Sequence, residues 1–93
     1  MASGRVLHVG RVVRGDGMPA AGALVWVASG TAPTPEIAVV CDGEGRFRLA
    51  LPPGRFEIRA RAGDGAEGAI EATAGTDPLQ FEIEVGGPEL KGG

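Results

Sequence analysis

Apolar and polar residues alternate along two long segments of this chain, 55–62 and 79–85. A period of two is typical of a β-strand with one buried face, because successive side chains point to opposite sides of a sheet. The apolar positions that we expect to face a core are Phe56, Ile58, Ala60, Ala62, Leu79, Phe81, Ile83 and Val85. The positions between them are charged or polar, so both segments predict strands with one face in water.

Five further segments carry apolar and β-branched residues and are also predicted to be strands. Turn signals separate them, and the clearest is Asp42-Gly43-Glu44-Gly45, in which Gly permits a positive φ and Asp closes a local hydrogen bond. No segment shows a helical period. The seven strands expected in this way are 6–13, 23–27, 37–41, 46–51, 55–62, 69–73 and 79–85. Strands at this regular spacing predict an all-β fold, a seven-stranded antiparallel β-sandwich.

The length of 93 residues is that of one domain. The 17 Gly and 7 Pro fall between apolar runs, as in a β protein with many tight turns. We expect residues 1–86 to form the domain and 87–93 a flexible C-terminal tail, because no core-facing pattern continues past Gly86. The N-terminus lacks a signal-peptide pattern. The chain as given is therefore expected in the cytoplasm, whereas a piece of a longer exported protein would lie outside the cell or in its envelope.

Five short motifs along the chain match the patterns of one family. They are His8-Val9-Gly10-Arg11-Val12-Val13 with Gly17-Met18-Pro19, Gly22-Ala23-Leu24-Val25-Trp26-Val27, Asp42-Gly43-Glu44-Gly45-Arg46-Phe47, and Leu51-Pro52-Pro53-Gly54-Arg55-Phe56-Glu57-Ile58-Arg59-Ala60. They resemble the V-x-G-x-V, G-x-P, G-A-x-V-x-V, T-D-x-x-G-x-F and L-P-P-G-x-Y-x-L-x-V patterns of the carboxypeptidase regulatory-like domain. The resemblance covers roughly residues 6–85, which is nearly the whole chain.

This resemblance implies a transthyretin-like or immunoglobulin-like sandwich. It also implies a non-catalytic accessory module of the kind often found in exported or cell-envelope proteins. The chain departs from the family at Cys41, where Thr is usual, and at Phe56, where Tyr is usual. The segment after Ala62 also lacks the family's common strand ending in Gly-Tyr. Because the shared motifs are Gly, Pro and apolar positions, they imply a fold and no particular ligand.

The inventory of reactive side chains is small: one His, one Cys, one Lys, no Tyr and no Asn. A catalytic triad or a Cys–His pair would have to use His8, which no nucleophile motif accompanies, so we expect an outward or edge-strand histidine. Zinc needs three or four Cys or His ligands. Asp16, Asp42 and Glu44 are too few in each turn for calcium and are expected to stabilise the turns. We expect no enzyme activity, no cofactor and no metal site, and Cys41 should be a small buried hydrophobe.

Charge is distributed unevenly along the chain, although the net charge is only −3. Residues 1–61 carry eight Arg and five acidic residues, a balance of +3, whereas residues 62–93 carry seven acidic residues and one Lys, a balance of −6. The two halves are expected to attract each other across neighbouring strands, to support self-association, or simply to form a solvated surface. The negative net charge predicts no nucleic-acid binding. The short apolar runs predict no membrane insertion.

Leu24 and Trp26 are the candidate partner contacts. Ala23, Val25 and Val27 are expected to face the core, which turns Leu24 and Trp26 toward the opposite face of the strand. An outward Trp beside Leu is suited to anchor a partner. In the alternative interpretation, the loop 30–35 or the N-terminus covers Trp26.

The sequence thus predicts a non-catalytic structural or interaction module that acts through sheet faces, loops or strand edges. Its partner would be another protein or further copies of itself. One alternative is a carbohydrate- or peptide-binding module centred on Trp26. The other is a self-assembling subunit of an oligomer or filament.

Overall fold

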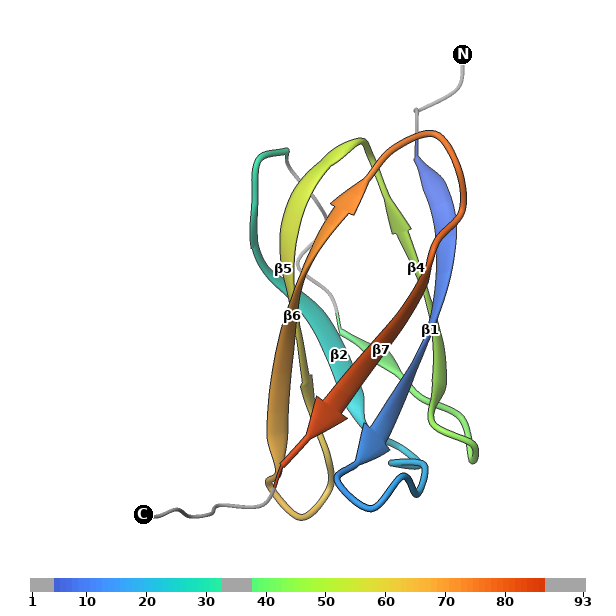
Figure 1. Ribbon diagram of the computed structural model, residues 1–93, viewed down its shortest axis with the longest axis vertical. Coiled ribbons are helices and arrows are strands. Elements are labelled where there is room, and N and C mark those ends of the chain that lie inside the picture. The colour runs from blue at the N-terminus through green and yellow to red at the C-terminus, as the bar shows by residue number, and fades with distance from the viewer. Residues whose placement is uncertain (1–4, 33–37, 87–93) are drawn as a thin grey trace.

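Two β-sheets face each other in the computed structural model, which describes residues 5–32 and 38–86 (Figure 1). Within these residues the chain forms seven strands and no helix, so no helix could cross a membrane. The strands are β1 (Val6–Arg14), β2 (Leu24–Gly30), β3 (Val39–Val40), β4 (Arg46–Leu51), β5 (Gly54–Arg61), β6 (Glu67–Ala74) and β7 (Gln80–Val85). The predicted all-β sandwich is confirmed. The expected tail, 87–93, lies outside the described residues.

The three-stranded sheet has the order β4-β1-β7, and the four-stranded sheet has the order β3-β2-β5-β6. The pairs β1–β4, β2–β3, β2–β5 and β5–β6 are antiparallel, as the sequence predicts. The pair β1–β7 is parallel, which differs from the prediction. The chain leaves β6, crosses to the other sheet and returns beside β1 in the same direction. Alternation marks the buried face of a strand and carries no information about the direction of its neighbour.

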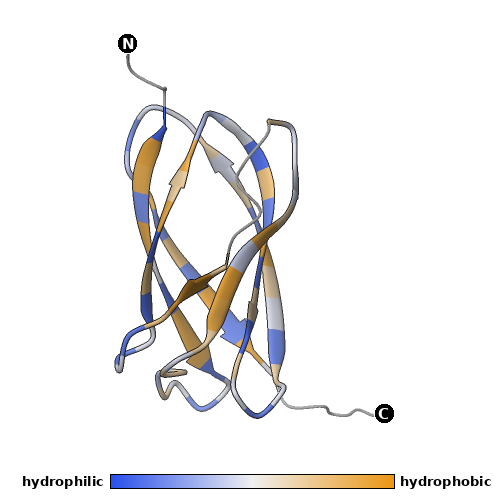
Figure 2. Ribbon diagram, turned by 180° about the vertical axis from the view of Figure 1, so that it is seen from behind, coloured by the Kyte–Doolittle hydropathy of each residue, from blue (hydrophilic) through white to orange (hydrophobic). Residues whose placement is uncertain are grey.

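The core lies between the inner faces of the two sheets. All four apolar positions expected inward on β5 and its end, Phe56, Ile58, Ala60 and Ala62, are buried. The same is true of Phe81, Ile83 and Val85 on β7, and Leu79 packs against this core in a partly buried position. Hydrophilic and hydrophobic colours alternate along several strands (Figure 2). Burial of one such large side chain stabilises the fold by about 1.5–3 kcal/mol.

Strand β1 places an unexpected set of residues in the core. His8 and Val12 are fully buried, whereas Leu7 and Val9 are among the exposed apolar residues. Gly10 explains this choice of face. It lies directly opposite Phe47 of β4, whose ring fills the space that a Cβ at Gly10 would need. An aromatic ring over a strand glycine covers the backbone and pins the register of the two strands.

The bounds of several strands differ from those expected. Strand β2 continues to Gly30 through an irregularity between Val27 and Ser29, where one extra residue bulges out of the ladder. Strand β6 is longer than expected because it pairs along the whole of β5. Strand β3 contains only Val39 and Val40, and its expected start at 37 lies outside the described residues.

Candidate functional site

Leu24, Trp26 and Val40 form what we call the β2–β3 apolar patch, on the outer face of the four-stranded sheet. Leu24 lies directly opposite Val40 on the edge strand, and residues opposite each other in a ladder share a face. Leu24 is 42% exposed and Val40 is 65% exposed. Trp26 is the next outward residue of β2 and is half-buried. The structure thus places both sequence-predicted contacts on one face and adds Val40, which the sequence analysis did not single out.

The inward positions of β2 agree with the prediction. Ala23 and Val25 are fully buried, and Val27 packs against the core in a partly buried position. Most of the two segments proposed to cover Trp26, loop 30–35 and the N-terminus, lies outside the described residues. Arg59 of β5 is the residue directly opposite Trp26, and Arg61 is directly opposite Leu24. The patch is therefore bordered by cationic residues on its β5 side.

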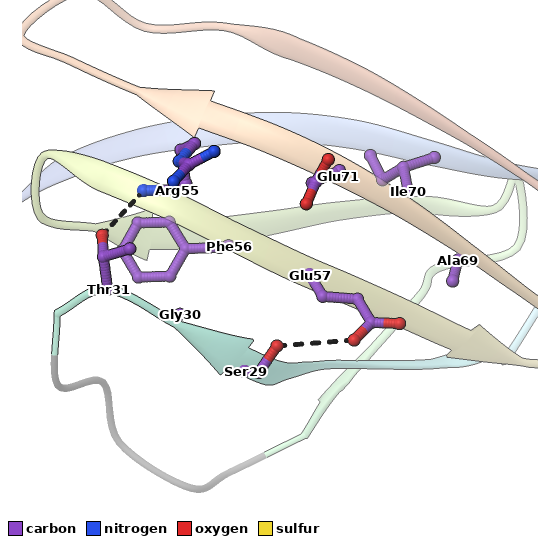
Figure 3. Close-up of a pocket in the computed structure, with 9 residues that line it drawn as sticks. All are labelled: Ser29, Gly30, Thr31, Arg55, Phe56, Glu57, Ala69, Ile70 and Glu71. Atoms are coloured by element: carbon purple, nitrogen blue, oxygen red, sulfur yellow. Dashed lines mark hydrogen bonds between the residues drawn. The ribbon is translucent and has the colours of Figure 1, made fainter.

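An open depression of about 670 Å³ lies farther along the same sheet, over β2, β5 and β6 (Figure 3). Ser29 Oγ is 3.4 Å from a carboxylate oxygen of Glu57, and the backbone N–H of Arg55 donates to Thr31 Oγ1 at 3.0 Å. Glu57 lies directly opposite Glu71, but Arg59 pairs with Glu57 at 3.1 Å. The depression therefore holds two carboxylates, and that of Glu57 is already paired with Arg59. Two carboxylates, one of them paired, are too few to bind a cation well.

A second cleft, of about 780 Å³, lies where β3 and β4 approach each other from different sheets. Its lining includes the outward arginines Arg11, Arg46 and Arg48 together with Phe81 and Val40. Arg11 and Arg46 are directly opposite each other on β1 and β4, an arrangement that is unfavourable for two like charges. Arg46 is compensated by an ion pair with Glu44 at 3.0 Å. This cleft gives one edge of the molecule a cationic character.

His8 occupies a different place from the one expected. The sequence analysis predicted an outward or edge-strand histidine, but β1 is the central strand of its sheet and His8 is fully buried. The prediction is wrong because Gly10 and Phe47 turn this face of β1 inward. Nδ1 accepts a 2.9 Å hydrogen bond from the backbone N–H of Leu79, while Nε2 has no partner within the described residues.

The surroundings of His8 are those of a core residue. Its ring centroid is 5.5 Å from that of Phe81, and burial lowers the pKa of the imidazole. The neutral ring is favoured because a charge in an apolar environment loses its hydration. A general base must reach a substrate proton through hydrogen-bond contact. The buried ring of His8 offers no such contact to a molecule in solution.

Cys41 is buried, as predicted, and its backbone N–H donates to the carbonyl of Ala23 at 2.8 Å. Burial raises the pKa of the thiol to about 11, and the neighbouring Asp42 carboxylate acts in the same direction. The thiolate is the nucleophilic form of cysteine, and this environment disfavours it. Cys41 therefore contributes apolar volume to the core.

The carboxylates in the turns accept hydrogen bonds from backbone N–H groups, which confirms the prediction that they stabilise the turns. Asp42 Oδ1 accepts from the N–H groups of Arg46 and Glu44, both at 2.9 Å, and these bonds hold the pKa of the Asp42 carboxyl below its usual value. Asp16 Oδ1 accepts from the Met18 N–H at 3.0 Å. Across residues 5–32 and 38–86, no three Asp, Glu, His or Cys side chains are grouped as they would be in a metal site.

Comparison with known proteins identifies the family. The family model of the carboxypeptidase regulatory-like domain matches residues 9–85, which include all of β2 to β7 and most of β1. No curated protein sequence matches the chain. The family is one of non-catalytic, immunoglobulin-like modules. The chain belongs to the carboxypeptidase regulatory-like domain family.

Proposed function

We propose that this domain is a protein-interaction module without catalytic activity of its own, and that the β2–β3 apolar patch contacts an apolar segment of a partner protein. The observation that carries the proposal is the direct pairing of Leu24 with Val40, both exposed, beside half-buried Trp26. Exposed large apolar side chains that adjoin one another favour association, because contact with a partner removes them from water. Interface hot spots are enriched in Trp for the same reason.

Protein is favoured over carbohydrate as the ligand of this patch. A sugar-binding Trp stacks its ring face against the ligand, and half-burial of Trp26 leaves only part of its ring available. Leu24 and Val40 offer a sugar no hydrogen bonds, whereas they match the apolar side chains of a protein segment.

Selection from a displayed peptide library tests the proposal. Peptides that bind the wild-type protein are measured against a Leu24→Thr, Val40→Thr double variant, in which both new side chains are β-branched and therefore suited to a strand. We expect affinity to fall about tenfold or more, which corresponds to about 1.4 kcal/mol. The control is Ala69→Thr, an exposed position on the outer face of β6. Peptides that bind the double variant as well as the wild type would refute the proposal.

A further inference from the structure

The three-stranded sheet has two edges whose outward side chains carry opposite charge. Strand β4 presents Arg46 and Arg48, and β7 presents Glu82 and Glu84, all exposed. Within the described parts of the chain, Arg48, Glu82 and Glu84 make no ion pair and no side-chain hydrogen bond. Each edge thus carries exposed charges without an ion pair, although Glu82 lies directly opposite Arg11 of β1 and the charge of Arg48 helps to lower the pKa of the Asp42 carboxyl. The β4 edge adjoins the β2–β3 apolar patch, because Arg46 and Arg48 line the same cleft as Val40.

The backbone of β4 is open on the side away from β1. Arg46 directs both its backbone groups away from β1, because its N–H donates to Asp42 Oδ1 and its carbonyl accepts from the Asp42 N–H at 3.0 Å. In an antiparallel ladder, alternate residues point toward and away from the partner strand. Arg48 and Ala50 therefore direct their N–H and C=O groups to the open edge.

The backbone of β7 is open along its first half. The carbonyl of Leu79 accepts from the Val9 N–H at 3.2 Å, so the residues in phase with Leu79 bond to β1. Gln80 and Glu82 lie out of phase and direct their backbone groups away from β1. The second half is covered by β6, since Gly86 N–H donates to Glu67 O at 3.1 Å. The open part of this edge is thus Gln80 to Glu82.

The two open edges match in direction and register. Strand β4 is antiparallel to β1 and β7 is parallel to it, so a second copy that continues the sheet places its β7 antiparallel to β4. With Arg48 opposite Glu82, both residues point their backbone groups into the gap, as do Ala50 and Gln80. The outward faces of the two strands then coincide over these two residue pairs. Cross-strand pairs of opposite charge stabilise such a ladder.

We propose that the domain associates head to tail with a second copy of itself, through an antiparallel pairing of β4 with β7 in which Arg48 faces Glu82. The contact is heterologous, so each copy retains one open edge and the association extends to further copies. The cationic edge repels another cationic edge, which selects this pairing over a symmetric one. The interface is short and its ion pairs are exposed, so its affinity depends strongly on ionic strength.

Sedimentation velocity across a range of protein concentrations tests the association. At low ionic strength we expect the mean mass to rise with concentration, and at about 1 M salt, where the Debye length is about 3 Å, we expect the monomer. Arg48→Glu and Glu82→Arg should each abolish the rise, and an equimolar mixture of the two should restore it. Arg55→Glu and Glu71→Arg are the matched controls, because they make the same charge changes on the outer face of the other sheet.

Disulfide trapping tests the register. Ala50→Cys and Gln80→Cys, introduced on separate copies, should form a mixed dimer because opposite residues in a ladder have Cα atoms about 5.5 Å apart, within disulfide range. Ala50→Cys combined with Glu84→Cys should form no such dimer, because these two positions are not opposite each other in the proposed register. A monomer at every concentration in low salt, or a mixture that fails to associate, would overturn the proposal and show that the charges only keep the edges apart. Neither result bears on peptide binding by the β2–β3 apolar patch.

Discussion

The backbone N–H of Leu79 donates a 2.9 Å hydrogen bond to Nδ1 of His8, and so joins two positions that are 71 residues apart in the chain. Because Nδ1 accepts this bond, the neutral ring carries its proton on Nε2. Protonation of Nδ1 would break the bond to Leu79 and place a positive charge in the core. The hydrogen bond that links β1 to the residue just before β7 therefore requires an uncharged His8.

Stability should fall as the pH is lowered through the range in which His8 titrates in the unfolded chain. Burial lowers the pKa of His8 in the fold below its ordinary value of 6.5, so the unfolded chain takes up the proton first. The contribution of His8 is complete above pH 6.5 and is lost as the pH falls below it, with a slope of at most about 1.4 kcal/mol per pH unit. Urea unfolding measured between about pH 8 and pH 5 gives this slope.

The control for this titration is His8→Leu, which is apolar and of similar size. The variant leaves the Leu79 N–H without its acceptor and is expected to lose about 1–3 kcal/mol at neutral pH. Its stability should nevertheless vary less with pH than that of the wild type over the same range. Equal slopes for the two proteins would show that His8 does not titrate on unfolding.

Substitution of Gly10 by Ala should destabilise the fold by about 1–3 kcal/mol, because the new methyl group meets the ring of Phe47. Thermal unfolding followed by circular dichroism measures the loss. Gly63→Ala is the matched control, since a Cβ at this position meets nothing within 4 Å. The account of β1 is contradicted if both variants unfold at the same temperature.

Cys41 should react slowly with thiol reagents in the folded protein. A pKa of about 11 in place of 9.0 lowers the thiolate fraction at neutral pH about 100-fold, and burial restricts access further. The measurement is the rate of alkylation at pH 7.5 in buffer and in about 8 M urea, where the thiol is exposed. A rate in buffer close to that in urea would show that Cys41 is accessible in the native state.

Asp42→Ala should lower the melting temperature more than Asp42→Asn. The carboxylate accepts from two backbone N–H groups, and Asn retains one acceptor oxygen in the same position, whereas Ala retains none. The pKa of Asp42 is lowered in the fold, so its contribution is present above the ordinary value of 3.8 and is lost as the pH falls through the lowered value. Calorimetry at pH 7 and at about pH 3 should show the difference between wild type and Asp42→Ala shrinking at the lower pH.

The alternating segments were the most predictable part of the fold. In β5 and β7 the apolar residues occupy only one of the two alternating sets of positions. Every residue expected to face inward is buried or partly buried. Strand β1 was harder because both of its faces carry apolar residues. A glycine and a histidine line the buried face, and this follows from contacts with Phe47 and Leu79 that are distant in sequence.

The site was predictable in part for similar reasons. The inward residues of β2 recur at every second position. This alternation predicted that Leu24 and Trp26 lie on the outer face. Val40 was missed because its position beside Leu24 depends on the pairing of β2 with β3. The charge imbalance between the two halves of the chain was visible in the sequence. Its concentration on opposite edges of one sheet arises from the β4-β1-β7 strand order.

The position of a bound peptide on the domain is the most direct test of its proposed function. Backbone amide shifts of the ¹⁵N-labelled protein are followed by nuclear magnetic resonance during titration with a peptide selected for binding. The account predicts that the largest changes fall on residues 24–27 and 39–41, at and beside the β2–β3 apolar patch. Changes confined to the depression over β5 and β6, with residues 24–27 unaffected, would contradict it.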